Sequence, residues 1–199
     1  VLFRSLHPSV PVKSVGELLV LARKRPGQLN CGSAGIGSST HLAAELFKGL
    51  AAVNIIHVPY KGAADAVIAL VGGQVEIMFA SLPTVLPHVR ANRLRALGVT
   101  GSTRSRAAPE LPTIAEAGLP GYEMTSWVGV MTRAGTPPAI IAELNRAIGE
   151  VLRSTEVADG YAREVAEAVG STPEQFDAYV RSEIVRWGKI LKQSGIRPD

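Results

Sequence analysis

The sequence contains a single cysteine, Cys31, among 199 residues. It therefore cannot form a disulfide within the chain, a CxxC redox pair or a zinc site with several cysteines. No apolar run of about 18 residues is present, so no segment is predicted to insert into or span a membrane. Aromatic residues make up 5% and charged residues 19% of the chain, whereas 46% are hydrophobic. This composition is typical of a globular domain and excludes a disordered chain.

Signals for catalysis, metals and cofactors are also missing. The four histidines are dispersed without HxH or HExxH spacing, so no metal site is predicted: they are His7, His41, His57 and His88. No P-loop lysine, dinucleotide fingerprint or GxSxG elbow is present. We therefore predict no catalytic residues and no cofactor, and we do not expect an enzyme.

The net charge is +4, which gives a mildly basic surface. The densest basic residues are spread over two segments without interleaved aromatics, and they are Arg93, Arg95, Arg104 and Arg106. Nucleic-acid binding favours basic residues clustered on one face with aromatics among them. The sequence therefore predicts no nucleic-acid partner.

Hydrophobic periodicity predicts four strands that alternate with helices in the first part of the chain. The strands are expected at 28–32, 53–58, 75–80 and 94–100. Such a βαβ series indicates an α/β fold with a mostly parallel sheet, helices on both faces and right-handed crossovers.

The remainder of the chain has a different pattern. Residues 123–131 are expected to be extended and to give residues 126–199 their one strand, and three amphipathic helices follow, the second of them over about 156–168. Their apolar stripes have no sheet of their own to cover. Residues 126–199 are therefore predicted to need either a partner chain or an N-terminal half.

The loop over 32–40 lies between a predicted strand and a predicted helix. Glycines permit close backbone approach, the helix start offers unpaired N–H groups, and three hydroxyls add donors. This combination suits a carboxylate or a phosphate. The alternative is a plain strand-to-helix turn with serine capping. The candidate ligand-binding residues here are Ser33, Ala34, Gly35, Gly37, Ser38, Ser39 and Thr40.

Two further loops follow predicted strands. Tyr60 and Lys61 could supply a hydroxyl, a ring face and a cation, or they could be a half-buried tyrosine and a surface lysine. Ala80 and Ser81 precede a helix, where Ser81 could contact ligand or act as a cap. Ligands gather at the carboxyl ends of parallel strands, so the three loops are predicted to form half of a cleft for a small anion.

These segments resemble the substrate-binding proteins of tripartite tricarboxylate transporters, the Bug or TctC family. The matching runs occur in the family's order from about His7 onward. They are 30–42 (NCGSAGIGSSTHL), 57–62 (HVPYKG), 73–75 (GQV), 94–100 (LRALGVT), 112–118 (PTIAEAG), 120–123 (PGYE), 127–129 (WVG) and 134–137 (AGTP). Each run alone is a weak signal, whereas their ordered combination is specific. Residues 1–5 do not fit the family's pattern and are left unassigned.

The resemblance implies the periplasmic-binding-protein type II, or Venus flytrap, architecture. Residues 8–125 would be a nearly complete second ligand-binding lobe, and 126–199 would be the C-terminal segment of the first lobe. The N-terminal part of the first lobe and a signal peptide are not in this sequence. The implied function is a periplasmic receptor that captures a small organic acid between two lobes and delivers it to membrane permease subunits. The three loops named above would hold the carboxylate; which acid they accept is left open.

Two other classes of protein compete with this reading. A cytosolic effector-sensing domain of a transcription regulator shares the architecture, but no DNA-binding motif precedes Val15 in this sequence. An enzyme could use the same loop for a phosphate or acyl group, but the sequence lacks a suitable lysine, triad or metal-ligand set.

Overall fold

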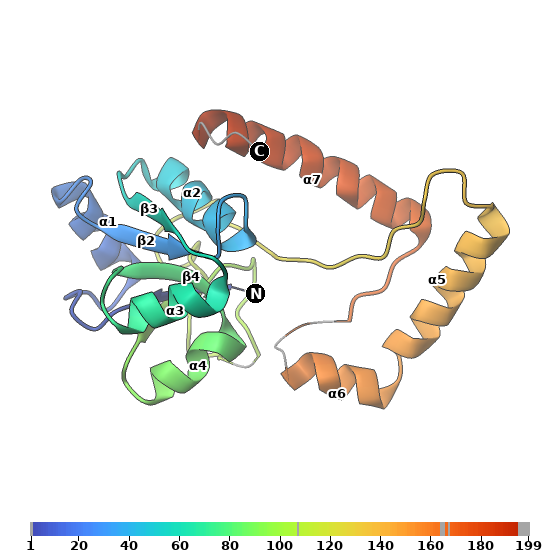
Figure 1. Cartoon of the computed structure of the whole chain (residues 1–199), viewed down its shortest axis with the longest axis horizontal. Coiled ribbons are helices and arrows are strands. Elements are labelled where there is room, and N and C mark those ends of the chain that lie inside the picture. Colours follow the sequence, from blue (N-terminus) through green and yellow to red (C-terminus); the bar gives the residue numbers. More distant parts are fainter. Residues whose placement is uncertain (1, 107, 164–165, 167, 195–199) are drawn as a thin grey trace. The chain divides into compact units, whose positions relative to one another are not determined.

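The computed structural model describes residues 2–106, 108–163, 166 and 168–194 (Figure 1). The chain divides into two compact units. We call residues up to 126, together with those from 190 on, the sheet unit, and residues 127–189 the helical unit. Each is described below by itself.

The sheet unit is built on a five-stranded sheet of order β3-β2-β4-β1-β5. β2 is parallel to β3 and β4, whereas β1 is antiparallel to β4 and β5. The four strands predicted from periodicity therefore run in one direction. The strands are β1 (Leu2–Leu6), β2 (Asn30–Ser33), β3 (Ile56–Pro59), β4 (Ile77–Ser81) and β5 (Arg95–Val99).

The antiparallel strand β1 was not predicted, and it includes residues 2–5, which had been left unassigned. All five residues of β1 are buried, and Leu2 pairs with Ser81 of β4. The strand escapes notice because Arg4 and Ser5 interrupt its apolar residues, so neither an alternating nor a continuous hydrophobic pattern results.

Four helices cover both faces of the sheet, with α1 and α2 on one face and α3 and α4 on the other (Figure 1). This arrangement confirms the predicted α/β layers. The helices are α1 (Val15–Lys24), α2 (Ser39–Ala51), α3 (Ala63–Val71) and α4 (Leu82–Arg90).

An aromatic cluster forms the core between α2 and the sheet. The rings of Phe47, Phe79 and Tyr122 lie 6.0 to 6.2 Å apart, centroid to centroid. The Tyr122 hydroxyl donates to the carbonyl of Ala43 at 3.0 Å. This bond ties the segment before the helical unit to α2.

Arg4 is an unusual member of this core. Its guanidinium is fully buried, lies 3.4 Å from the centroid of the Phe47 ring, and has no hydrogen-bond partner among the described residues. Burial lowers its pKa to about 9. A buried cation that only aromatic faces accompany opposes folding.

The helical unit contains α5 (Pro138–Leu152), α6 (Thr155–Arg163) and most of α7 (Pro173–Ser194). The expected extended segment over 123–131 forms no strand in the described chain, since no strand lies alongside to pair with it. The helix expected over 156–168 is observed as far as Arg163, and 164, 165 and 167 lie outside the described residues.

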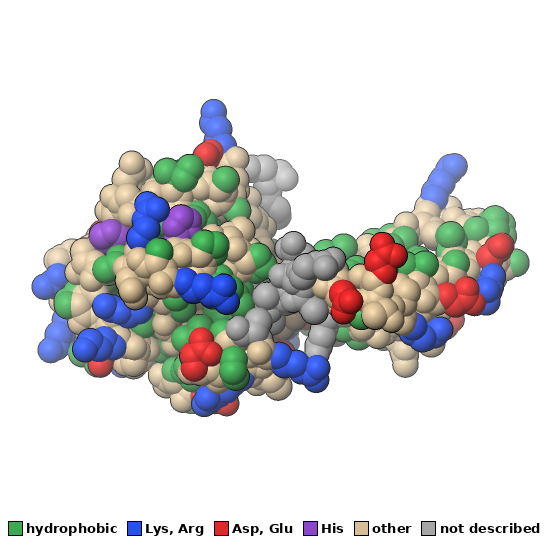
Figure 2. All heavy atoms as spheres, turned by 90° about the horizontal axis from the view of Figure 1, so that it is seen from below, with side chains coloured by type: hydrophobic (Ala, Val, Ile, Leu, Met, Phe, Trp, Pro, Cys, Tyr) green, Lys and Arg blue, Asp and Glu red, His purple; other side chains and the backbone are tan. Residues whose placement is uncertain are grey.

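The apolar stripes of α5 and α7 are only partly covered. No residue of α5 is buried, and Leu144 is 42% exposed. The main aromatic contact places Trp127 edge-on to Phe176 and Tyr179, with centroid distances of 5.5 and 5.6 Å. On the face of the helical unit that Figure 2 shows, hydrophobic side chains lie among charged side chains of both signs.

Candidate functional site

The Gly/Ser loop, residues 33–40, joins the end of β2 to the start of α2. Gly35 and Gly37 adopt φ values of 127° and 76°, which side chains rarely tolerate. A Cβ on Gly35 would also lie 3.4 Å from the carbonyl oxygen of Tyr60. The glycines therefore fix the path of this loop.

Most hydroxyls of the loop are engaged in shaping it. Thr40 Oγ1 accepts the Ala34 N–H at 2.9 Å and contacts Ser38 Oγ at 2.9 Å. Ser38 Oγ donates to the carbonyl of Gly35 at 2.7 Å and accepts the N–H of His41 at 3.3 Å. Ser33 Oγ accepts the Gly35 N–H at 3.2 Å. These three hydroxyls thus act as an internal scaffold.

The remaining donors belong to the first turn of α2. Within the described residues, no acceptor contacts the backbone N–H groups of Ser39 and Thr40. The Ser39 side chain is half-exposed at the same turn. Unpaired N–H groups and the positive end of the helix dipole favour an anion at this position.

Two histidines that we did not predict as site residues support the Gly/Ser loop. The His41 and His57 rings stack with a centroid distance of 3.7 Å and an angle of 10°. His41 Nδ1 accepts the Gly37 N–H at 3.1 Å, and His57 Nε2 lies 2.6 Å from Ser33 Oγ. Burial lowers the pKa of both rings, that of His57 to about 4.

Strand register is the signal that could have found His57. In the parallel β2–β3 pair, His57 lies opposite Cys31. Cys31 precedes Ser33 by two residues in β2. Side chains two apart point to the same face of a sheet. His57 and Ser33 therefore share a face, but this deduction needs the register, which the sequence does not supply.

The second predicted loop lies directly beside the first. The Tyr60 N–H donates to the carbonyl of Ser33 at 3.0 Å. The Tyr60 ring covers Gly32, where a Cβ would lie 3.5 Å from a ring carbon. Lys61 is exposed next to this contact. The structure therefore brings Tyr60 and Lys61 to the Gly/Ser loop.

The residues predicted as a third loop, Ala80 and Ser81, are the last two of β4, and α4 follows directly. β4 pairs with β2 on the side away from β3. Ala80 is buried, whereas Ser81 is half-exposed and its hydroxyl lies 3.0 Å from Thr84 Oγ1. Thr84 Oγ1 also donates to the carbonyl of Ser81 at 2.7 Å. Because β2, β3 and β4 are parallel and adjacent, the three loops lie at one edge of the sheet.

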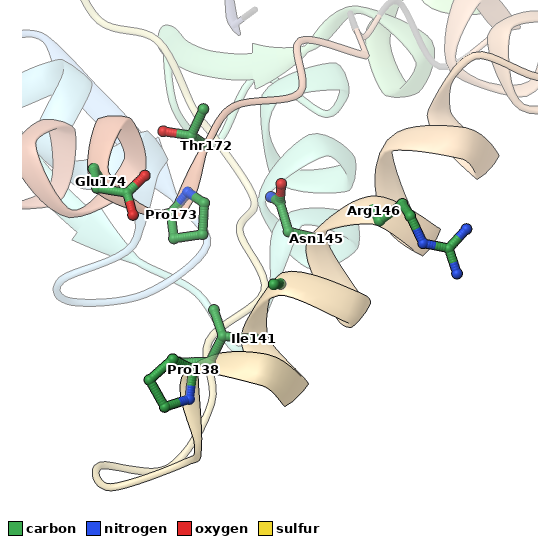
Figure 3. A pocket seen from close by; sticks show the side chains of 8 residues that line it. Pro138, Ile141, Asn145, Arg146, Thr172, Pro173 and Glu174 are labelled. Atoms are coloured by element: carbon green, nitrogen blue, oxygen red, sulfur yellow. The ribbon is translucent and has the colours of Figure 1, made fainter.

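A hollow of about 560 Å³ lies elsewhere, in the helical unit. Figure 3 shows Ile141 and Asn145 of α5 pointing toward Thr172 and Pro173, and Arg146 pointing away. Asn145 Nδ2 donates to the carbonyl of Ser171 at 2.8 Å, which connects the two sides. No predicted ligand residue lines it. Its lining is Pro138, Ile141, Ala142, Asn145, Arg146, Thr172, Pro173 and Glu174.

Two other types of feature are absent from the described residues. No cluster of three or more metal-ligating side chains is present in them. None of their helices combines the length and the apolar character that a bilayer crossing requires.

The sheet unit is thus an α/β domain with donor-rich residues at the carboxyl edge of its parallel strands, which is where α/β proteins bind their ligands. The sequence profile of the tripartite tricarboxylate transporter family receptor, TctC, matches residues 4–196. The chain belongs to this family of receptors. The match includes most of β1, which the resemblance in the sequence had left out.

Similar proteins agree with this assignment. BugT of Bordetella pertussis is 37% identical over 191 residues, which are 96% of this chain and 59% of BugT. A protein encoded between tcbD and tcbE in a Pseudomonas species is 39% identical over 180 residues, covering 90% of this chain and 54% of that protein. The chain therefore spans little more than half the length of these curated relatives.

Two solved structures of relatives hold organic acids. An R. palustris protein with adipate superposes with a TM-score of 0.87 at 40% identity, and the match covers all of this chain and 66% of that one. MatC from Rhodopseudomonas palustris with bound malate has a TM-score of 0.81 at 30% identity, covering 96% and 66% of the two chains.

Proposed function

We propose that this chain is the ligand-binding part of a receptor for a small organic acid. The main support is the first turn of α2, where unpaired backbone N–H groups lie at the end of a loop that is held by internal hydrogen bonds. Such groups bind a carboxylate without a full countercharge. Relatives whose structures contain adipate and malate support a carboxylate as the ligand class.

In this proposal the residues of the site contact different parts of the ligand. The N–H groups of Ser39 and Thr40 would donate to one carboxylate, and the exposed Lys61 would add positive charge beside it. Tyr60 and Ser81 would contact the rest of the ligand from the neighbouring strand ends. Water could bridge donors that stand too far away for a direct bond.

The other half of the cleft and the later steps also belong to this proposal. The partly covered stripes of α5 and α7 suit the returning segment of a first lobe, and the matched relatives are longer than this chain. The receptor would close on its ligand, act in the periplasm and hand the acid to permease subunits. The family name and periplasmic relatives support this sequence of events.

Calorimetric titration and thermal unfolding with adipate and malate test the proposal. Adipate at 100 times its dissociation constant should stabilise the protein by about 2.7 kcal/mol. Adipamide has the same carbon chain without carboxylates and serves as the control ligand, which should have no effect. If neither acid binds, or if adipamide binds equally well, the carboxylate site is refuted for these ligands.

Ser39 offers a sharper test at a single atom. It is the first helical residue after the cap Ser38, whose ψ of 158° is compatible with a following proline. Ser39→Pro therefore removes one N–H while the helix is retained. Because bonds to charged groups contribute about 1.5–3 kcal/mol, adipate affinity should fall about tenfold or more.

Ser39→Ala is the matched control, since it removes the hydroxyl but keeps the N–H. It should weaken binding less than Ser39→Pro does. Equal affinities in Ser39→Pro and the unmodified protein would show that the α2 start does not contact the acid.

A further inference from the structure

The stacked pair His41–His57 connects two elements to the same loop. His41 is the third residue of α2 and His57 lies within β3, and their rings are nearly parallel at 3.7 Å. One nitrogen of each ring is directed at the Gly/Ser loop, toward the Gly37 N–H and the Ser33 hydroxyl respectively. The pair thus contacts the loop at its first residue and in its middle.

The hydrogen bonds define the protonation state that the loop requires. His41 Nδ1 accepts a backbone N–H, so this nitrogen carries no proton, and Nε2 of the neutral ring faces Glu45 Oε1 at 3.6 Å. Ser33 has one hydroxyl hydrogen, and His57 Nε2 at 2.6 Å is nearer to it than the Gly35 carbonyl at 3.2 Å. We therefore assign His57 Nε2 as the acceptor.

The surroundings oppose a proton on either ring. Glu45 favours a charge on His41, but its Oε1 is already paired with Lys48 Nζ at 2.6 Å. Lys48 and the neighbouring ring disfavour a charge on His57. The titratable group of β2 is Cys31, whose buried thiol has its pKa raised to about 12 and stays uncharged.

We propose that His41 and His57 are a positioning pair, which holds the Gly/Ser loop in its anion-binding conformation only while both rings are uncharged. The inference rests on the proposed function of this loop. A proton on His41 Nδ1 removes the acceptor of the Gly37 N–H. A proton on His57 Nε2 leaves the Ser33 hydroxyl only its longer contact with the Gly35 carbonyl, at 3.2 Å. Mild acidification would therefore loosen the loop and release the organic acid.

The direction of the pH effect follows from linkage. A histidine in an opened loop returns toward its ordinary pKa of about 6.5, whereas the closed loop holds the pKa of His57 at about 4. Between these two values the opened loop binds more protons than the closed loop. Acid therefore favours opening as the pH falls through this window, and the closed loop is fully favoured above it.

Variants that keep the acceptors but cannot titrate separate the proposal from a merely structural role. Asparagine places Oδ1 near the position of His Nδ1, and glutamine places Oε1 near that of Nε2. The double variant His41→Asn, His57→Gln should therefore close the loop at every pH. His41→Leu removes the acceptor and should leave the Gly37 N–H unpaired at every pH. His88→Gln, on α4, is the matched control for losing a titratable ring.

The first measurement is independent of ligand. Amide hydrogen exchange of Gly35 and Gly37, corrected for intrinsic pH dependence, is followed by NMR from about pH 7 to about pH 4.5. Protection should fall about tenfold or more in the unmodified protein and in His88→Gln, and stay nearly constant in the double variant. An identical pH profile in the double variant and the unmodified protein would overturn the proposal.

The second measurement is adipate affinity over the same pH range. Comparing variants at equal pH cancels the protonation of adipate itself. Toward acid, affinity should fall about fivefold or more beyond the loss seen in the double variant. If adipate does not bind at neutral pH, the proposed function fails for this acid, whereas the exchange data still decide the role of the pair. Equal losses in both proteins would contradict a link between the pair and binding.

Discussion

The sheet unit and the helical unit are built from similar sequence material but differ in what covers their apolar residues. Both contain amphipathic helices with clear apolar stripes. Within the described part of the chain, every buried hydrophobic residue lies between Leu2 and Met124. In α5, by contrast, no residue is buried.

The difference shows that a helical stripe specifies a helix but not its stability. In the sheet unit the stripes of the helices pack on a sheet that the same unit supplies. Most helical stability in proteins comes from such packing, and little comes from intrinsic propensity. The helices of the helical unit have the same pattern but less to pack against, so several of its large hydrophobic side chains are exposed.

The largest expected difference in the free energy of unfolding comes from making the same leucine-to-alanine substitution in each unit. Leu70 of α3 is fully buried, and Leu144 of α5 is 42% exposed. Leu70→Ala should lower the free energy of unfolding of the sheet unit by about 2–5 kcal/mol. Leu144→Ala should change that of the helical unit by less than about 1 kcal/mol, because little apolar area is lost from the interior.

The two units can be monitored separately. Both tryptophans of the chain, Trp127 and Trp187, lie in the helical unit, so their fluorescence reports its unfolding. Far-UV circular dichroism in urea reports both units. A loss for Leu144→Ala as large as that for Leu70→Ala would mean that the α5 stripe is covered in solution.

The strands illustrate what sequence can and cannot predict of the fold. The four parallel strands can be predicted from the sequence, because each is a short apolar run bounded by turn residues and by segments with helical periodicity. β1 is not visible, since Arg4 and Ser5 are buried against local preference. The segment over 123–131 shows the reverse error, because an extended pattern becomes a strand only beside a partner.

Arg4 provides the second test of the comparison, because its buried charge destabilises the better-packed unit. Replacing a buried ion pair by apolar side chains of similar volume can stabilise a protein by about 1–4 kcal/mol, and Arg4 has no counterion among the described residues whose attraction would be lost. Arg4→Met should therefore raise the urea midpoint of the sheet unit. It should leave tryptophan fluorescence of the helical unit unchanged.

Arg25→Met is the control for this prediction, since Arg25 is exposed after α1. A surface change of this kind should lie within about 0.5 kcal/mol of the unmodified protein. If Arg4→Met proves destabilising, the cation–π contact of Arg4 with Phe47 outweighs the desolvation of the guanidinium.

The candidate site was predictable to a similar degree. Residue types alone pointed to the Gly/Ser loop, because glycines and hydroxyls before a helix suit an anion. They could not show that Ser33, Ser38 and Thr40 are engaged within the loop. The stacked histidines were missed because they are far apart in sequence, and only strand register and helix docking bring them together.

The smallest expected effect compares equivalent caps in the two units. Ser14 Oγ accepts the Glu17 N–H at 3.1 Å before α1, and Thr172 Oγ1 accepts the Gln175 N–H at 3.2 Å before α7. Removing either hydroxyl by substitution to alanine costs about 1 kcal/mol of helix stability. The part of the protein that is destabilised should nevertheless differ: the whole unit in one case, and a single helical turn in the other.

Ser14→Ala should lower the urea midpoint of the whole sheet unit, because α1 is packed into its core through residues such as Leu18. Thr172→Ala should instead raise amide exchange only in the first turn of α7, because an uncovered helix can fray there without unfolding its neighbours. Hydrogen exchange read by mass spectrometry distinguishes the two responses. If Thr172→Ala destabilises the helical unit as a whole, its helices unfold cooperatively despite their exposed stripes, and the contrast between the units is one of degree.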